Sequence, residues 1–218
     1  MNFRTRVEQA REISLRRLRF SACVDDLIQF ISYFPSPPVV IAHDVEALVA
    51  LKTVNVKSLS ALILAAPTIP QNVQVTRSHT LRLLRLEYLP LIFLGRPFRP
   101  EEKDLRKSLA PLPESVRAKI ASEIVPESQH MVSELFSCRV QIDASRVECP
   151  TFILAGGQDA IIPPTPSRLF ARWLGSEYRE YPDQGHWIIE LDGEPLVEEI
   201  HRWLVQKLGK QILLAEFP

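Results

Sequence analysis

Three short apolar runs constrain the fold of this chain more than any other feature of its sequence. They occupy residues 39–42, 61–66 and 151–155, and their apolar residues follow one another without alternating with polar ones. Runs of this length and composition are typical of strands that are buried on both faces of a parallel sheet. A fourth, shorter strand is expected at residues 178–181.

Helical patterns fill the segments between these runs. We expect helices at residues 24–31, 45–52, 167–174 and 194–208, and a basic surface helix at residues 1–20. The alternation of strand and helix predicts an α/β fold with an open, mostly parallel central sheet. A chain of 218 residues is expected to form it as a single domain.

A helical insertion is expected between the second and third strands. Residues 79–137 have a helical pattern that is interrupted by six prolines, at positions 90, 97, 100, 111, 113 and 126. We interpret residues 79–146 as a helical lid within the domain. This segment would either bind an apolar substrate or bury itself against the sheet.

Charge and cysteine content narrow the function. The 26 Lys and Arg residues balance the 26 Asp and Glu residues, so the chain lacks the basic footprint of a dedicated nucleic-acid-binding protein. Its most apolar stretches, residues 59–67 and 89–94, are far shorter than the roughly 20 residues of a membrane-spanning helix. The three cysteines, Cys23, Cys138 and Cys149, fit neither a disulfide framework nor a zinc site and favour a reducing, cytoplasmic setting. We expect a small-molecule substrate, with no metal, cofactor, nucleic acid or membrane.

Three polar residues follow the predicted strands at the end of the sheet where parallel sheets bind ligands. Asp44 follows the first strand, Asp159 the third and His186 the fourth. A residue in the nucleophile position, then an acid, then a histidine is the chain order of the α/β-hydrolase triad.

The sequences around these residues resemble α/β-hydrolases with a helical cap. Residues 39–47, VVIAHDVEA, are similar to the nucleophile elbow of that family. Residues 149–163, CPTFILAGGQDAIIP, resemble its acid-bearing strand and loop, and residues 183–187, DQGHW, resemble its catalytic-histidine loop. The resemblance extends from about residue 24 to the final helix, and the first strands of the family are missing.

The resemblance implies a role for each of these residues. Asp44 would be the nucleophile, His186 would activate water, and Asp159 would orient His186. The backbone N–H of Val45 would supply one donor of the oxyanion hole.

The reaction follows from the residue type at position 44. Family members that cleave esters carry serine there, and a carboxylate that attacks an acyl carbon would give a reactive anhydride. Attack of Asp44 on an sp3 carbon instead gives an alkyl ester that water can hydrolyse, as in haloalkane and haloacetate dehalogenases and epoxide hydrolases. The halide-binding Trp that follows the nucleophile in haloalkane dehalogenases is Val45 here. Tyr88 in the predicted lid is the substrate-binding acid for an epoxide, or a packing residue.

Three features favour the alternative, a degenerate, non-catalytic relative that acts by binding: Glu46, the missing loop, and Val45 in place of the halide-binding Trp. Glu46 stands where the elbow needs a small residue, and its carboxylate is expected to raise the pKa of one of the two neighbouring acids and weaken the nucleophile. The residues before Val39 are too few for the first strands of the family and for the loop that supplies the second oxyanion donor. Because missing strands would expose a sheet edge, a homo-oligomer is also expected.

Overall fold

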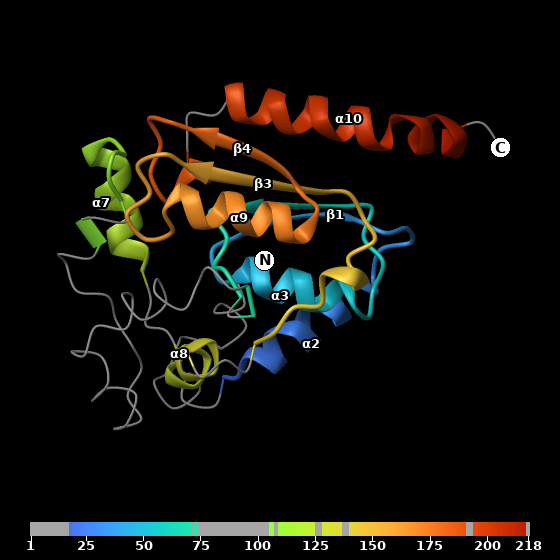
Figure 1. Ribbon diagram of the computed structural model, residues 1–218, viewed down its shortest axis with the longest axis horizontal. Helices are drawn as coiled ribbons and strands as arrows, with labels where there is room; N and C mark the ends of the chain where they lie inside the picture. Colours follow the sequence, from blue (N-terminus) through green and yellow to red (C-terminus); the bar gives the residue numbers. More distant parts are fainter. Residues whose placement is uncertain are drawn as a thin grey trace.

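A parallel sheet of four strands forms the centre of the structure. The computed structural model describes residues 18–70, 72–73, 105–106, 109–124, 128–136, 140–190 and 194–216. The strands are β1 (Val39–His43), β2 (Ala61–Ala65), β3 (Thr151–Gly156) and β4 (Glu177–Tyr181), in the order β1-β2-β3-β4. Every neighbouring pair is parallel (Figure 1). The predicted α/β class is confirmed, and each predicted strand is present to within one residue at either end.

The register of the sheet brings the ends of its strands together. His43 pairs with Ala65 at the ends of β1 and β2, and Gly156 pairs with Tyr181 at the ends of β3 and β4. The loops that follow the strands therefore leave the sheet at the same end. In open α/β sheets this is the end at which ligands bind.

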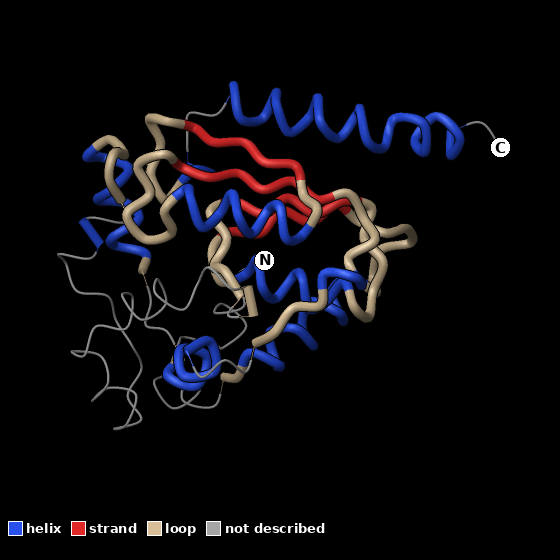
Figure 2. The backbone as a smooth tube through the Cα atoms, in the orientation of Figure 1, coloured by secondary structure: helices blue, strands red, loops and turns tan. Residues whose placement is uncertain are grey.

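Helices cover both faces of the sheet (Figures 1 and 2). On one face lie α2 (Phe20–Ile31), α3 (Glu46–Val54) and α9 (Pro164–Leu174), and on the other lies α10 (Glu194–Glu216). The larger core cluster joins α2, α3 and α9 to the sheet, where it includes Ala42, Leu62, Leu64 and Ile153. The second cluster joins α10 to the opposite face. Since full burial of one large aliphatic side chain stabilises a fold by about 1.5–3 kcal/mol, these two clusters hold the layers together.

Local sequence signals set the bounds of the helices. Pro164 begins α9, where a missing N–H costs nothing, and Gly175 ends it in the left-handed conformation with a φ of 70°. The helices expected at residues 24–31 and 45–52 are present as α2 and α3. The last helix was expected to end at residue 208, but α10 continues to Glu216 because the residues after Gly209 are mostly strong helix formers.

The segment between β2 and β3 is described in part. It contains α7 (Glu114–Glu123), α8 (Gln129–Phe136) and the short helix η4 (Ala144–Arg146). Much of the predicted lid over residues 79–146, including Tyr88, lies outside the described residues, as do residues 1–17 of the expected N-terminal helix.

Two packing contacts fix the described parts of this segment. On one side α8 meets α2, where a side-chain oxygen of Glu134 accepts from the N–H of Phe20 at 2.8 Å. On the other side, three residues near α7 form a small cluster of their own, against which Trp187 packs: Leu109, Leu112 and Ile120. The short helix η5 (Ile188–Glu190) follows that tryptophan.

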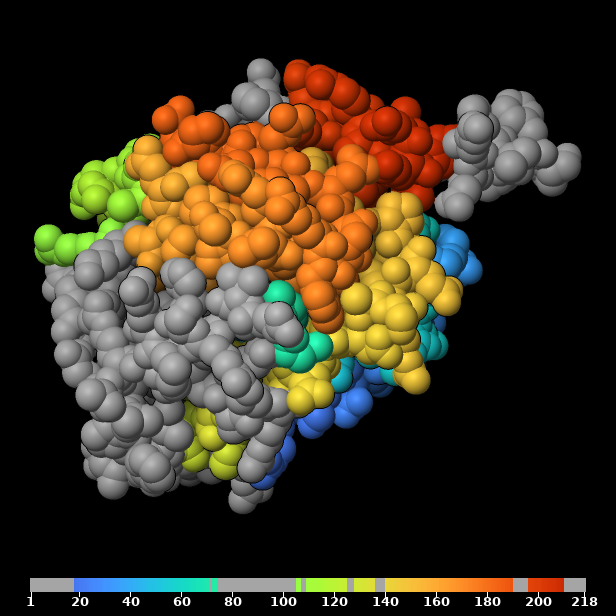
Figure 3. Space-filling view, viewed as in Figure 1, coloured from blue at the N-terminus to red at the C-terminus, as the bar shows by residue number. Residues whose placement is uncertain are grey.

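The surface view shows how the last helix relates to the rest of the molecule. α10 forms a ridge along one margin of the surface that β4 and α9 present (Figure 3). Within the described part of the chain, neither this helix nor any other is long and apolar enough to cross a membrane.

Candidate active site

Asp44 lies in the sharp turn between β1 and α3. Its φ is 50°, in the left-handed region that non-glycine residues rarely adopt. The turn is held from two sides: the Asp44 N–H donates to the Ala65 carbonyl at 3.1 Å, and the Asp44 carbonyl accepts from the Thr68 N–H at 3.0 Å. A strained residue between a strand and a helix is what the predicted elbow requires, because the strain lifts the side chain clear of the sheet.

The two residues after Asp44 begin the next helix. Among the described residues, nothing accepts a hydrogen bond from the backbone N–H of Val45, which stands at the N-terminal end of α3. The partial positive charge of a helix N-terminus favours an anion at this point. Glu46 is the first residue of α3 and is half-buried, so the turn accommodates its longer side chain.

Asp159 lies in the loop that follows β3 and is buried, with 4% of its surface exposed. Its Oδ1 accepts from the backbone N–H of Ile161 at 2.7 Å and of Ile162 at 2.8 Å. These two bonds fix the carboxylate and leave Oδ2 directed at His186, whose Nδ1 lies 2.9 Å away. The loop thus fixes both the place and the orientation of the acid.

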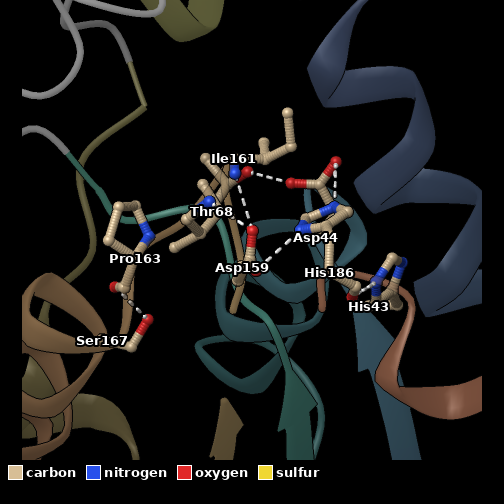
Figure 4. A network of polar contacts seen from close by, with 9 residues as sticks. His43, Asp44, Thr68, Asp159, Ile161, Pro163, Ser167 and His186 are labelled. Atoms are coloured by element: carbon tan, nitrogen blue, oxygen red, sulfur yellow. Dashed lines mark hydrogen bonds and ion pairs between the residues drawn. The ribbon is translucent and has the colours of Figure 1, made fainter. Parts of the chain in front are cut away.

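His186 lies between two carboxylates (Figure 4). On the side opposite Asp159, its Nε2 lies 3.7 Å from Oδ2 of Asp44. The imidazole is almost fully buried, whereas one third of the Asp44 side chain is exposed. The structure therefore brings together the three residues that the chain order singled out, with Asp44 as the member that solvent reaches.

The charges of this group stabilise one another. Burial by itself lowers the pKa of His186, but the hydrogen bond with Asp159 and the contact with Asp44 raise it to about 10. Burial by itself raises the pKa of Asp44, but His186, His43 and the Thr68 hydroxyl lower it to about 2. At neutral pH His186 is therefore an imidazolium and Asp44 a carboxylate.

The pKa of Asp44 depends on His186 rather than on its neighbour in the sequence. Glu46 was expected to raise the pKa of one of the two neighbouring acids and so weaken the nucleophile. The pKa of Asp44 is lowered, because His186, His43 and the Thr68 hydroxyl outweigh the effect of burial. Asp44 is ionised at neutral pH.

Two glycines let the loops of the site approach each other. A Cβ at Gly156 would collide with the carbonyl oxygens of Gln184 and Gly185, so the acid loop and the histidine loop touch through their backbones. A Cβ at Gly185 would collide with the backbone of Ala110, so the histidine loop also touches the segment before α7. His186 is placed by backbone contact on both sides of its loop.

Two further residues belong to the group, and the sequence did not assign them. The Thr68 hydroxyl donates to Oδ1 of Asp44 at 2.5 Å. His43 donates from Nε2 to the carbonyl of His186 at 2.9 Å, and the two imidazole rings lie 4.8 Å apart. Burial and the neighbouring His186 lower the pKa of His43. Thr68 follows the second strand, so extending the search to the loop after that strand would have found it.

The described residues show no metal site: no three histidine, cysteine or acidic side chains among them cluster closely enough to hold an ion. Of the predicted site residues, Asp44, Asp159, His186 and Val45 lie together, and Tyr88 lies outside the described residues.

Comparison with known proteins shows the family and the fold of this chain. A family model described as "Serine aminopeptidase, S33" matches residues 15–192. A thermophilic esterase from Thermogutta terrifontis is 21% identical, with a TM-score of 0.62 over 87% of this chain and 73% of its own. A monoacylglycerol lipase from Paleococcus ferrophilus is 20% identical, with a TM-score of 0.63 over 87% and 76%. An esterase from Exiguobacterium antarcticum is 14% identical, with a TM-score of 0.58 over 85% and 74%. No curated protein matches by sequence.

Proposed function

This chain belongs to the serine aminopeptidase family of α/β-hydrolases, and from that premise we propose that it is a hydrolase whose nucleophile is a carboxylate, Asp44. Its substrates are small and apolar and carry an electrophilic sp3 carbon, as an epoxide or a carbon–halogen bond. The observation that carries the proposal is the placement of an ionised, partly exposed Asp44 on a strained turn, 3.7 Å from an imidazole that a buried acid holds.

The residue type selects the bond that is attacked. A serine alkoxide attacks an acyl carbon and forms an acyl-enzyme, which is an ester that water then hydrolyses. A carboxylate on an acyl carbon gives an anhydride, whereas a carboxylate on an sp3 carbon gives an ordinary ester. The pKa of about 2 makes Asp44 a weak base that is fully ionised, which suits displacement at carbon rather than proton removal.

The first half-reaction forms an ester on Asp44. Its free oxygen attacks the substrate carbon, and the carbon–halogen or carbon–oxygen bond breaks with its electron pair leaving on the halide or on the ring oxygen. A halide departs as the anion, and a ring oxygen takes a proton from water or from an acid of the lid. Tyr88 is the residue that we propose for this acid.

The second half-reaction needs His186 as a base, so its imidazole must first lose a proton. Ester formation on Asp44 makes this loss easier. Because the pKa of His186 is raised partly by Asp44, esterification removes one of the two negative charges that keep the imidazole protonated. His186 then releases its proton to solvent and takes one from the attacking water. Hydrolysis releases the alcohol, restores the Asp44 carboxylate and returns the proton to His186.

Trapping the ester tests this function. His186→Ala removes the base, so a protein incubated with a panel of epoxides, haloalkanoates and activated esters should gain on Asp44 the mass of one epoxide, or the mass of one haloalkanoate less the hydrogen halide that leaves. The adduct should be absent from the double variant that also carries Asp44→Asn. His201→Ala, which removes an exposed histidine of α10, is the matched control and should leave no adduct behind.

A folded His186→Ala variant that gains no mass with any compound would overturn the proposal. That outcome would favour a protein that binds a ligand without turning it over, for which Glu46 at the elbow is the supporting observation. Circular dichroism on the same sample separates this result from a failure to fold.

We also propose that the segment over residues 79–146 is a lid on this site. Support comes from its described part, where the backbone of Ala110 reaches the histidine loop at Gly185 and where Trp187 packs on the cluster near α7. If so, Trp187→Ala should loosen the cover and raise the KM for the apolar substrate found by the trapping experiment.

Self-association through β1 is a further part of the proposal. In the described part of the chain β1 pairs with β2 alone, and Ile41 is 55% exposed. Unprotected apolar edge strands pair readily with other strands. Sedimentation should show a concentration-dependent dimer that Ile41→Lys weakens, and a wild-type monomer at every concentration would contradict this.

A cytoplasmic setting is proposed as well. It is supported by the cysteine pattern of the sequence, which fits neither a disulfide framework nor a zinc site, and by Cys149, which is not in a disulfide, while Cys138 lies outside the described residues. Mass spectrometry of the protein isolated in the presence of an alkylating agent should find all three cysteines alkylated, and a disulfide would contradict this setting.

A further inference from the structure

Thr68 touches the elbow at two points. Its backbone N–H donates to the Asp44 carbonyl at 3.0 Å, and its hydroxyl donates to Oδ1 of Asp44 at 2.5 Å. It reaches this place because β2 ends at Ala65 and Ala66 adopts a φ of 41°, which turns the chain toward β1. Figure 4 shows Thr68 beside the Asp44 carboxylate, with a dashed line for the hydrogen bond between them.

These contacts make the two carboxylate oxygens of Asp44 unequal. Oδ1 is held by the Thr68 hydroxyl, whereas Oδ2 lies 3.7 Å from His186, beyond hydrogen-bonding distance. An oxygen that accepts a short hydrogen bond is the poorer nucleophile, since its lone pair is partly engaged. Oδ2 is therefore the oxygen that is free to attack.

We infer that Thr68 is a catalytic hydrogen-bond donor that selects Oδ2 of Asp44 as the attacking atom and then stabilises the negative charge on Oδ1 when water hydrolyses the ester. The inference rests on the proposed function, and it assigns a role to a side chain that the chain order of the triad did not single out.

The charge on Oδ1 follows from the chemistry of the second half-reaction. After alkylation at Oδ2, Oδ1 is the carbonyl oxygen of the ester. Water adds to Cγ as His186 takes its proton, and the carbonyl electron pair moves onto Oδ1. When the intermediate collapses, the bond between Cγ and Oδ2 breaks, Oδ2 leaves in the alcohol with a proton from His186, and the oxygen from water stays on Asp44.

The Thr68 hydroxyl is already in position for that charge. It is within hydrogen-bonding distance of Oδ1 before reaction, so no reorganisation is needed when the charge develops. Losing one preorganised donor of this type costs on the order of 10²–10³ in rate. The first half-reaction builds no charge on Oδ1, because Asp44 loses charge as it attacks, so the same donor contributes little there.

Thr68→Val removes the hydroxyl while keeping the shape of the side chain, and it tests the inference. With a substrate identified by the His186→Ala trap, kcat should fall by about 10²-fold as hydrolysis becomes limiting. The value of kcat/KM, which reports ester formation, should stay within about threefold of the wild type. The ester on Asp44 should then be visible by intact mass during turnover, and Thr68→Ser should restore kcat.

The matched control is Thr53→Val in α3. That threonine is fully buried, but its hydroxyl donates to the carbonyl of Val49 within its own helix, so its loss should leave the kcat to kcat/KM ratio unchanged. An equal fall in kcat and kcat/KM for Thr68→Val, or an unchanged kcat, would overturn the role of Thr68. Absence of an adduct in His186→Ala would instead overturn the proposed function itself, so the two failures are distinguishable.

Discussion

The Nε2 atom of His186 lies 3.7 Å from Oδ2 of Asp44, which is the distance of an ion pair rather than of a direct hydrogen bond. The other ring nitrogen, Nδ1, forms a hydrogen bond with the buried Asp159, and that bond fixes the ring plane. Nε2 therefore faces Asp44 without forming a hydrogen bond to it. Water has access to this junction, since one third of the Asp44 side chain is exposed.

The first prediction concerns the charge of His186. Its ring should be protonated at pH 7 and titrate near pH 10, because two carboxylates flank it. Asp44→Asn removes one of them and should lower that pKa by at least one unit. Ring ¹⁵N shifts measure both, with the exposed His201 as the control that Asp44→Asn leaves unchanged. A wild-type midpoint near 6.5 would contradict the arrangement.

The second prediction is the pH dependence of stability. The pKa of His186 is raised from 6.5 to about 10 on folding, so its contribution is fully present below pH 6.5 and is lost as the pH rises toward 10. The pKa of Asp44 is lowered from 3.8 to about 2, so its contribution is present above pH 3.8 and is lost as the pH falls toward 2. Urea unfolding should give a plateau between about pH 4 and 6.5.

Variants separate the two limbs of that profile. Above pH 6.5, the free energy of unfolding of the wild type should fall toward that of His186→Ala, while the acidic limb should be reduced in Asp44→Asn. A difference between wild type and His186→Ala that stays constant from pH 6 to 10 would show that the histidine contributes by packing alone.

A third prediction follows from the bonds of Asp159. In Asp159→Asn the amide oxygen can still accept from the two backbone N–H groups, which leaves its NH₂ facing Nδ1 of His186. That arrangement requires the imidazole tautomer with the proton on Nε2, which cannot take a proton from water. Hydrolysis of the ester should slow by roughly 10⁴-fold while the ester still forms. Intact mass should show the adduct, and rapid turnover by this variant would argue against His186 as the base.

Much of the fold was predictable because its signals are local. Unalternated apolar runs predicted the first three strands, the fourth was expected from a short segment at residues 178–181, and the Asp159 and His186 loops were recognisable from glycines and from their order along the chain. The elbow at Asp44 was predictable from its place between a strand and a helix, although its residue type departs from the serine of the family.

The remaining features depend on contacts between distant segments. Thr68 has no charge and sits in no motif; its place after the second strand is its one signal in the sequence, and its contact with Asp44 is seen only in the folded structure. The lowered pKa of Asp44 comes mainly from His186, which lies more than a hundred residues along the chain and overcomes the opposing effect of burial. Neither that contact nor the burial has a local signature in the sequence.

The fourth prediction tests whether backbone contact positions the histidine loop. A Cβ at Gly185 would collide with the carbonyl of Ala110. Because the colliding atoms belong to the backbone, they cannot easily move away. Gly185→Ala should therefore lower the free energy of unfolding by about 1–3 kcal/mol, as overpacking does in other cores. Turnover should fall further than stability requires, because the displaced loop carries His186.

Gly209 in α10 supplies the matched control, because among the described residues a Cβ there meets only Val205, at an ordinary 3.8 Å. Gly209→Ala should raise the free energy of unfolding by about 0.5–1 kcal/mol, since alanine loses less conformational freedom in a helix, and should leave turnover unchanged. The two Gly→Ala substitutions should thus change the free energy of unfolding in opposite directions. This difference separates the steric contact at the site from the general effect of replacing glycine. Equal stabilisation of both variants would mean that the histidine loop has room to move, and that Asp159 alone holds His186 in place.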